Sequence, residues 1–498
     1  MTSRSVAEAY HEQTKYSPAS IAAGRRSLDF DAQPSAFKSY PHGEAVDLTR
    51  FLPDGDELRS DAALAAWREA LPEAERGLAE LSHLLYFTNG VTGLVPQRPA
   101  PLLMRAAPSA GGLYPTELYL VVRDRTGLSD GIYNYLVRDH ALVRVCGVPS
   151  PEFVDAACFG APEVARADIL VICTGVFARS AWRYEDRAYR RVLLDTGHVI
   201  GNMALCAPLV GHSLQQLGGF SDAAWEDALF LDPTEEGVLA VAALGIDSRG
   251  GPVPVWPGER TTASDVPAGQ RLVALHTATR LLVPAGQAVD AHASEGPGPA
   301  ARLMPGQQLA ADPTELTGRL GVTILSRRSC RSFSGGGIDV GALSEMLALA
   351  FATRDQLVAP GLLQTWLVVH DVAGMEPGCY QYDSDQQLAR QVRFLPLREP
   401  MRRLALGQDL AGDAAVVVVH TANLPEAVAR LGDRAYRHLH MDAGHVGQRL
   451  SLGAVALGLG ASGIGGFFDD EVNDLVGIPA TQAVVYLTTL GVPERAER

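Results

Sequence analysis

Short runs of β-branched and apolar residues alternate along this chain with longer stretches in which apolar residues recur at helical spacing. Runs of the first kind predict strands: LYLVV at 118–122, ADILVICTG at 167–175, AAVVVVHTA at 414–422 and AVVYLTTLG at 483–491. Two long stretches, which begin at Tyr189 and at Tyr436, have the period of buried helices. This mixture predicts an α+β fold built around a sheet.

The chain contains an internal repeat. Matching segments recur at a constant offset of 247 residues, and a constant offset over about ninety residues indicates two copies of one fold. The matched pairs are GIYNY at Gly131 with GCYQY at Gly378, DRAYR at Asp186 and Asp433, DTGHV at Asp195 with DAGHV at Asp442, and GGF at Gly218 and Gly465.

Upstream of these segments the two copies differ. LSHLL at Leu81 matches LSEML at Leu343 with an offset of 262, so the first copy holds 15 more residues before its strand at 118–122. Those residues surround RAAPSAGGLYP, 105–115, which the second copy lacks. The second copy in turn has RRSCRSF, 327–333, which the first copy lacks. Each copy has therefore lost a different part.

The repeat predicts two domains joined by a linker. Residues 1–261 form the first domain with an N-terminal extension, and residues 313–498 form the second. The segment between them, 262–312, includes AGQAVDAHASEGPGPAARLMPGQQLAAD, which is rich in Ala, Gly and Pro and has no hydrophobic period. Such composition predicts a flexible connection.

Composition excludes some partners. Of the 498 residues, 47% are hydrophobic and 20% are charged, as in a globular protein with a large core, and the formal net charge is −15. An acidic chain without clustered Lys and Arg does not favour a nucleic-acid partner. We identify neither a secretory signal nor a membrane-spanning run, so we expect a cytoplasmic protein without a membrane partner.

Three segments are candidates for ligand binding. RRSCRSF places Arg327, Arg328 and Arg331 around Ser329, a set of donors that suits a phosphate but also suits an exposed basic helix start. PSAGGLYP, from Pro108, is a glycine-rich loop whose backbone could approach a planar ligand, or an ordinary turn. GIGGFFDD, from Gly463, is a third glycine-rich turn.

Two further patterns are weaker. GLGASG at 458–463 fits the dinucleotide fingerprint G-x-G-x-x-G, but it follows a predicted helix rather than a strand, so we reject dinucleotide binding there. DTGHV and DAGHV place Asp195 with His198, and Asp442 with His445, three residues apart on helices. Metal binding is the alternative, but we favour a polar contact between helices and expect no metal.

WRYEDRAYR, 182–190, differs from its counterpart ARLGDRAYR at one informative position. Tyr184 of the first copy is replaced by Leu431 in the second, although DRAYR is kept in both. A tyrosine present in only one copy favours a task that is performed once, over a surface position that has drifted.

These segments together resemble a known family. YHEQTK (10–15), LDF with QPSAFKSYP (28–41), RAAPSAGGLYPTELYLVV, the DRAYR–LDTGHV helix and GGF are similar to those of the SagB-type thiazoline/oxazoline dehydrogenases of the nitroreductase superfamily. The two-copy arrangement is similar to the tandem-domain azoline dehydrogenases of thiopeptide pathways. The resemblance implies two nitroreductase-like domains that form a pseudo-dimer, with FMN between them, and leaves open whether pairing occurs within or between chains.

The resemblance assigns roles to the segments that each copy has kept. The second domain would supply the phosphate site and the turn against the isoalloxazine ring, and the first domain would supply the glycine-rich loop. The cofactor residues so implied are Arg327, Arg328, Ser329, Arg331, Pro108, Ser109, Ala110, Gly111, Gly112, Gly463, Ile464, Gly465 and Gly466. The reciprocal site would lack both parts, so we expect one FMN per chain.

The implied reaction is the oxidation of azolines to azoles in a ribosomally made peptide, with the reduced flavin reoxidised by O2 and with cyclodehydratase proteins as partners. Arg183 and Tyr184 stand where the family has a Lys–Tyr pair. Because arginine is a poor base, we assign proton removal to Tyr184, with Arg183 stabilising its phenolate; the alternative is that Arg183 marks altered chemistry or only binds the substrate. Two alternatives are another FMN oxidoreductase, such as a carrier-bound intermediate dehydrogenase or a nitro or quinone reductase, and a flavin-free peptide-binding scaffold.

Overall fold

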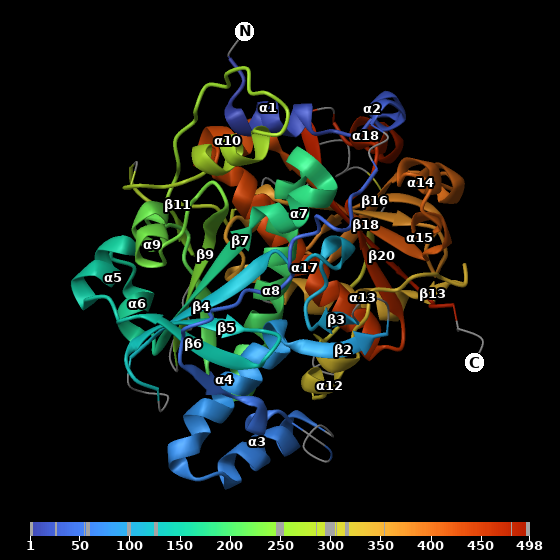
Figure 1. The fold of residues 1–498 in the computed structure, drawn as a ribbon. Coiled ribbons are helices and arrows are strands. Elements are labelled where there is room, and N and C mark those ends of the chain that lie inside the picture. Colours follow the sequence, from blue (N-terminus) through green and yellow to red (C-terminus); the bar gives the residue numbers. More distant parts are fainter. Residues whose placement is uncertain are drawn as a thin grey trace.

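The structure is a computed structural model that consists of two halves packed side by side (Figure 1). It describes residues 3–24, 27–53, 55, 60–96, 101–123, 128–245, 253–284, 286–293, 304, 306–313, 318–352, 354–479 and 481–494. The predicted linker residues 285, 294–303 and 305 lie outside the described part.

The first half is built on an antiparallel sheet in the order β1-β6-β5-β4-β7-β9-β8. Its strands are β1 (Ala45–Asp47), β4 (Thr116–Val122), β5 (Gly131–Leu136), β6 (Ala141–Cys146), β7 (Ile169–Val176), β8 (Ser213–Gln216) and β9 (Glu236–Gly245). The central strands β4, β7 and β9 are almost wholly buried, which explains their continuous apolar sequences.

The second half repeats this sheet in the order β12-β17-β16-β14-β18-β20-β19. Its strands are β12 (Gly306–Gln308), β14 (Gln364–Val369), β16 (Gly378–Asp383), β17 (Leu388–Arg393), β18 (Val416–Asn423), β19 (Gly460–Ile464) and β20 (Gln482–Gly491). Even the irregularities match, because the register shift at Cys173 in β7 recurs at His420 in β18, 247 residues later. The predicted strands, the repeat and the α+β class are confirmed.

Helices cover the sheets. Those of the first half are α1 (Val6–Gln13), α2 (Pro18–Ala23), α3 (Asp61–Ala70), α4 (Glu73–Asn89), α5 (Pro151–Ala157), α6 (Pro162–Arg166), α7 (Phe177–Tyr184), α8 (Ala188–Cys206) and α9 (Asp222–Ala228). Those that follow are α10 (Arg271–Ala278), α12 (Leu320–Ser326), α13 (Val340–Phe351), α14 (Arg398–Leu404), α15 (Asp409–Asp413), α16 (Leu424–Leu431), α17 (Ala435–Ala456) and α18 (Asp469–Val476).

The two predicted long helices, α8 and α17, meet at the centre of the molecule (Figure 1). Glycine permits their close approach: a Cβ at Gly197 would lie 2.1 Å from the carbonyl oxygen of Met441, and one at Gly444 would lie 2.2 Å from that of Leu194. These four residues form symmetric pairs under the 247 offset. The stretch Phe177–Val210 is long and apolar enough to cross a membrane, but 83% of its most apolar window is buried, as in a core helix.

The predicted linker is not flexible throughout. Within it, α10 packs against α1 and α8, and it corresponds to α1: His276 and Thr279 stand where α1 and its end have His11 and Thr14, at an offset of 265. Tyr189 contacts the His276 ring nitrogen Nδ1 at 3.0 Å, and Tyr436 contacts that of His11 at 3.2 Å. Residues 271–279, inside the predicted linker, thus form a helix and its end with a buried polar network. The domain and linker boundaries stay a prediction.

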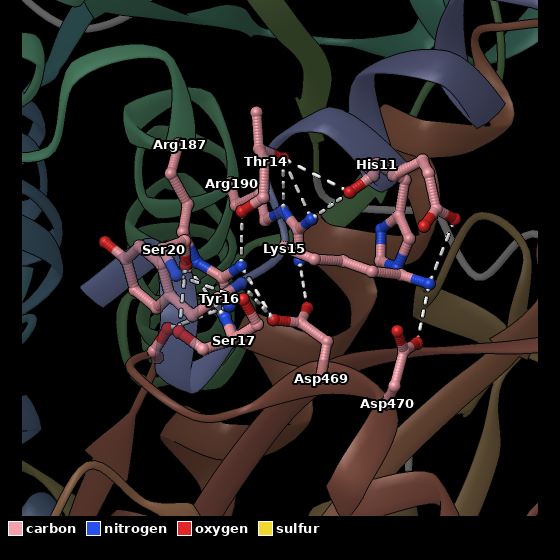
Figure 2. A network of polar contacts seen from close by, with 12 residues as sticks. His11, Thr14, Lys15, Tyr16, Ser17, Ser20, Arg187, Arg190, Asp469 and Asp470 are labelled. Carbon is pink, nitrogen blue, oxygen red and sulfur yellow. Dashed lines mark hydrogen bonds and ion pairs between the residues drawn. The ribbon is translucent and has the colours of Figure 1, made fainter. Parts of the chain in front are cut away.

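Two buried ion-pair clusters join the halves. In one, Asp469 of α18 accepts from Arg187 at 2.9 Å and from Arg190 at 2.7 Å, and both arginines also bind Thr14 after α1 (Figure 2). In the other, Asp222 of α9 accepts from Arg434 and from Arg437, each at 2.6 Å. The second cluster is the symmetric counterpart of the first, and the side chains of both are at most 3% exposed.

Candidate functional site

A cavity of about 630 Å³ lies where the two halves meet. The first half contributes the glycine-rich loop and one face of α8, and the second half contributes the segment after α12, the strand β19 and β20. The lining residues are Pro108, Ser109, Ala110, Gly111, Gly112, Arg191, Leu194, Asp195, His198, Ser329, Arg331, Ser462, Gly463, Gly465 and Tyr486. The structure thus brings together the segments that each copy has kept.

Asp195 holds the glycine-rich loop in place. Its carboxylate accepts from the Ser109 hydroxyl at 2.5 Å and from the Ala110 backbone N–H at 3.2 Å. The loop then turns through Gly111 and Gly112, whose φ angles of +68° and +67° favour glycine. Burial raises the pKa of Asp195 to about 7, although these hydrogen bonds and Arg191 act in the opposite direction. The loop is therefore anchored to α8 rather than mobile at the surface.

The opposite wall depends on Tyr486 of β20. Its hydroxyl lies 3.2 Å from Nε2 of His198, whose other ring nitrogen donates to the Leu194 carbonyl at 2.7 Å. A Cβ at Gly463 would lie 1.8 Å from this tyrosine hydroxyl, so glycine is required there. Asp195 and His198 thus have separate partners, and the described residues contain no group of three or more potential metal ligands.

Not every predicted cofactor residue faces the cavity. Arg327 is 2% exposed and donates to the carbonyls of Ala106 and Arg105, whereas Arg328 donates to the Thr92 carbonyl of the hairpin formed by β2 (Val91–Val95) and β3 (Leu102–Arg105). Their guanidinium groups therefore tie the second half to the first instead of lining the cavity.

The glycine-rich turn also divides in its roles. Ile464 is buried in the core of the second half, in the cluster that the sheet forms with α14, α15 and α18. Gly466 lies outside the cavity lining, against Leu406 and Gln408. Of the predicted residues in the second half, the structure brings Ser329, Arg331, Gly463 and Gly465 to the cavity.

The predicted catalytic pair lies behind the glycine-rich loop. A Cβ at Gly111 would lie 3.0 Å from the Tyr184 hydroxyl and 3.3 Å from Cδ of Arg183. Two guanidinium groups flank the Tyr184 ring, with Cζ of Arg191 5.0 Å and Cζ of Arg183 5.7 Å from the ring centroid. Burial raises the pKa of Tyr184, and Arg191 opposes this more strongly than Arg183 does. The protonated phenol is therefore the resting form at neutral pH.

The sequence analysis missed Arg191 and Tyr486 and assigned Asp195 and His198 only to a contact between helices. A signal for the first two was present. Under the 247 offset, Arg191 aligns with His438 and Tyr486 with Leu239, so the arginine and the tyrosine each occur in one copy only, as Tyr184 does. The reasoning that selected Tyr184 would have selected these residues as well.

At the reciprocal position the chain crosses over itself, and a smaller cavity of about 450 Å³ remains beside Gln215–Gly219 and Trp256. Gln216 donates to the Gln356 carbonyl at 2.8 Å, and Arg449 donates to the Gln356 side chain at 2.9 Å. β10 (Pro254–Val255) runs across Gly218, and the Gly219 Cβ position lies 2.4 Å from the Trp256 ring. A separate cavity of about 830 Å³ is lined by residues 351–426 of the second half alone and contains none of the predicted site residues.

Comparison with known proteins defines the class. Residues 68–246 and 324–492 each match the nitroreductase family, so the chain belongs to this family and carries its domain twice. A solved structure of a nitroreductase-family protein from Anabaena variabilis is 38% identical, with a TM-score of 0.87, and covers 99% of this chain and 100% of its own. The expected tandem nitroreductase-like fold is confirmed.

Individual relatives match parts of the chain. MJ1384 of Methanocaldococcus jannaschii, named as a nitroreductase, is 32% identical over 34% of this chain and 84% of its own length. The trifolitoxin-processing protein TfxB of Rhizobium leguminosarum bv. trifolii is 29% identical over 43% of this chain and 60% of its own. The microcin B17-processing protein McbC of Escherichia coli is 29% identical over 28% and 54%. The chain therefore spans only just over half the length of the two processing proteins.

Proposed function

We propose that this chain is an FMN-dependent dehydrogenase that oxidises thiazolines or oxazolines to azoles in a ribosomally made peptide. The observation that carries the proposal is the composite cavity, whose two walls come from the complementary segments kept by the two copies. Its similarity to proteins named for the processing of trifolitoxin and microcin B17 supports a peptide substrate. O2 would be the final electron acceptor, and cyclodehydratase proteins would supply the azoline.

The residues around the cavity fit FMN. Ser329 and Arg331 offer a hydroxyl and a guanidinium for the phosphate. Gly111 and Gly112 of the first half and Gly463 and Gly465 of the second line the cavity, so backbone without side chains can approach a planar ring. When bound, FMN supplies the two-electron acceptor, while the protein fixes the substrate and removes a proton. The reciprocal position lacks counterparts of both the Ser329–Arg331 segment and the glycine-rich loop, which favours one FMN per chain.

Tyr184 is the proton acceptor in this proposal. Tyr184 is not among the residues that line the cavity, but its hydroxyl lies against Gly111, which is, so the proposal places the substrate ring next to this loop. To accept a proton it must be ionised, and the charges of Arg191 and Arg183 favour the phenolate against the effect of burial. Because burial prevails, the fraction of active enzyme should increase with pH throughout the neutral and moderately alkaline range.

Flavin stoichiometry and substrate turnover test the proposal together. The purified protein should release about one FMN per chain, identified by absorbance and mass, and should remove two mass units per ring from an azoline-containing peptide. A ratio near two would contradict the single composite site. Bound FMN with NAD(P)H-dependent reduction of quinones and no action on azolines would favour another oxidoreductase, and no flavin after reconstitution would favour a scaffold.

The Tyr184→Phe variant tests the proposed base. We expect a loss of about 10²- to 10⁴-fold in kcat with FMN still bound, because a general base contributes an effect of that size. The increase of kcat with pH should disappear at the same time. Tyr380→Phe, which removes a phenol hydroxyl bonded to the Glu376 carbonyl of the second half, is the matched control. A wild-type rate that does not change between pH 7 and 10 would argue against a tyrosine base.

A further inference from the structure

Arg191 has an unusual environment for a buried charge. It is 5% exposed and lines the composite cavity. Among the residues that the structure describes, its guanidinium has neither a hydrogen-bond acceptor nor an ion-pair partner, and its contact with the Tyr184 ring is through the π face. Burial of an unpaired charge is costly, so such a group points to an acceptor that binds in the cavity.

Neighbouring arginines of α8 show that this is specific to Arg191. Arg187 and Arg190 are also buried, but both pair with Asp469 and donate to residues in or just after α1. In the second copy the position of Arg191 is taken by His438, whereas Arg187 and Arg190 keep their counterparts. Arg187 and Arg190 therefore belong to the duplicated interface, whereas Arg191 is an arginine only in the copy that contributes it to the composite cavity.

The side chain reaches across the cavity rather than along its wall. A Cβ at Gly465 of the second half would lie 1.5 Å from Nη1 of Arg191, so this glycine makes room for the guanidinium. The same guanidinium flanks Tyr184, the proposed base of the first half. Arg191 therefore lies between the residue that removes the proton and the glycine-rich turn of the second half.

Two of the described arginines line the cavity, Arg191 from the first half and Arg331 from the second. The charges that act on Arg327 are those of Arg328 and Arg331, in the segment that suits a phosphate. The cations that act on Tyr184 are Arg191 and Arg183. Arg191 is thus the cavity arginine that contacts Tyr184, whereas Arg331 follows Ser329 in the segment expected to hold phosphate.

We propose that Arg191 donates to the electron-accepting ring of FMN and balances the negative charge that the ring gains on reduction. This inference rests on the proposed FMN site and extends it, because it assigns the tuning of the cofactor to a residue outside the predicted set. A fixed cation in a cavity of low dielectric stabilises the charged form of its neighbour. Arg191 is here a positioning and tuning residue, and proton removal stays with Tyr184.

The test uses FMN and riboflavin, which differ only in the phosphate. Arg191→Gln should weaken both ligands by the same factor, about 10- to 100-fold, the range for a hydrogen bond to a charged group. It should also lower the midpoint potential of bound FMN. The decrease is about 30 mV for each factor of ten by which the affinity for reduced FMN falls more than the affinity for oxidised FMN. Arg331→Gln should weaken FMN but not riboflavin, and Arg191→Lys should restore part of the potential.

Stability supplies a readout that is independent of the flavin. Because the Arg191 charge is unpaired, Arg191→Gln should leave the flavin-free protein as stable as the wild type or more stable, whereas Arg190→Gln should destabilise it. The control for charge is Arg430→Gln in α16, a partly exposed arginine that occupies the position of Arg183 in the second copy. It should change neither affinity nor potential.

The outcomes separate this inference from the proposed function. A protein that binds no flavin overturns both. If FMN binds and Arg191→Gln changes neither affinity nor potential, only the inference fails. If that variant weakens FMN but not riboflavin, Arg191 binds the phosphate and the inference is overturned as well. Loss of stability equal to that of Arg190→Gln would show a structural role instead.

Discussion

The interface between the two copies and the cavity beside it have diverged to very different extents. At the interface, Asp222 with Arg434 and Arg437 reproduces Asp469 with Arg187 and Arg190, and the histidine–tyrosine contacts of α1 and α10 are likewise paired. In and beside the cavity the two copies differ. Tyr184 and Arg191 of the first copy correspond to Leu431 and His438 of the second, and Tyr486 of the second copy corresponds to Leu239 of the first.

The difference indicates what each region needs. A pseudo-twofold interface has to be complementary on both sides of its axis, so loss of a buried charge from either copy leaves its partners uncompensated. A cavity needs only one complete set of walls. Retention of the interface in duplicate and of the cavity once is the pattern expected if the second copy became a partner for the first rather than a second catalyst.

The largest predicted effect concerns the duplicated interface. Asp469→Ala and Asp222→Ala should each lower the free energy of unfolding by about 3–5 kcal/mol, because each leaves two buried arginines unpaired. Urea denaturation of the full chain measures this. The adjacent Asp470→Ala removes an exposed partner of Lys15 and should cost at most about 1 kcal/mol. If the two variants lose different amounts of unfolding free energy, the two ion-pair clusters do not contribute equally to stability.

The symmetric aspartates of the two long helices should give the next largest effect, through pH. Burial raises the pKa of both Asp195 and Asp442 to about 7 in the folded protein. The unfolded chain releases these protons near pH 4, so the contribution of each carboxyl to stability is lost as pH rises from about 4 to about 7, at about 1.4 kcal/mol per unit.

Asp442→Asn should remove half of this dependence, since the amide does not ionise. Urea midpoints measured between pH 4 and 8 should therefore decline less steeply for the variant than for the wild type. Both proteins must be compared without flavin, because a ligand bound near Asp195 would add its own linkage. An unchanged slope would mean that Asp442 is ionised throughout this range.

A ligand-binding experiment asks whether the same pair of aspartates differs in function. Asp195 accepts from Ser109 and Ala110 of the glycine-rich loop, whereas Asp442 accepts from Val358 and Ala359, which take the place of that loop in the second copy. Asp195→Ala should weaken FMN binding about tenfold, roughly 1.4 kcal/mol, by freeing the loop. Asp442→Ala should leave it unchanged. Equal effects on FMN affinity would indicate that the second copy still contributes to the site.

Much of this organisation could be predicted from the sequence because the repeat carries long-range information. The offset of 247 identified two copies, and the complementary losses identified which segments share a cavity. The correspondence of α1 with α10 was missed because its offset is 265 and only Ala, His and Thr recur in A-x-H-x-x-T, a pattern too short to detect without the buried network around it.

The direction in which individual side chains point could be predicted less well from the sequence. RRSCRSF shows three arginines beside a serine, but the sequence alone does not indicate which of them finds backbone carbonyls of the other half. Arg327 does so at Ala106, and Arg331 faces the cavity. Such assignments depend on contacts across about 220 residues of chain, which local pattern cannot supply.

The smallest predicted effect concerns the residue after Tyr184, where the first copy has a glutamate and the second copy has a glycine in a similar backbone conformation. Glu185 has a φ of +51° and a ψ of −137°, and the second copy places Gly432 there with a φ of +66° and a ψ of −167°. A side chain in this region costs of order 1 kcal/mol. Glu185→Gly should therefore stabilise the protein by about 1 kcal/mol or less, since glycine also gains entropy in the unfolded chain.

The reverse substitution sharpens the comparison. Gly432→Ala should destabilise the protein by more than Glu185→Gly stabilises it, because its Cβ would lie 2.2 Å from the Gly258 carbonyl oxygen in addition to the strained φ. Both are measured by urea denaturation. If Glu185→Gly instead lowers stability, contacts of the Glu185 side chain outweigh the backbone strain. If it lowers kcat, Glu185 is retained because it positions Tyr184, and not because the position drifted after duplication.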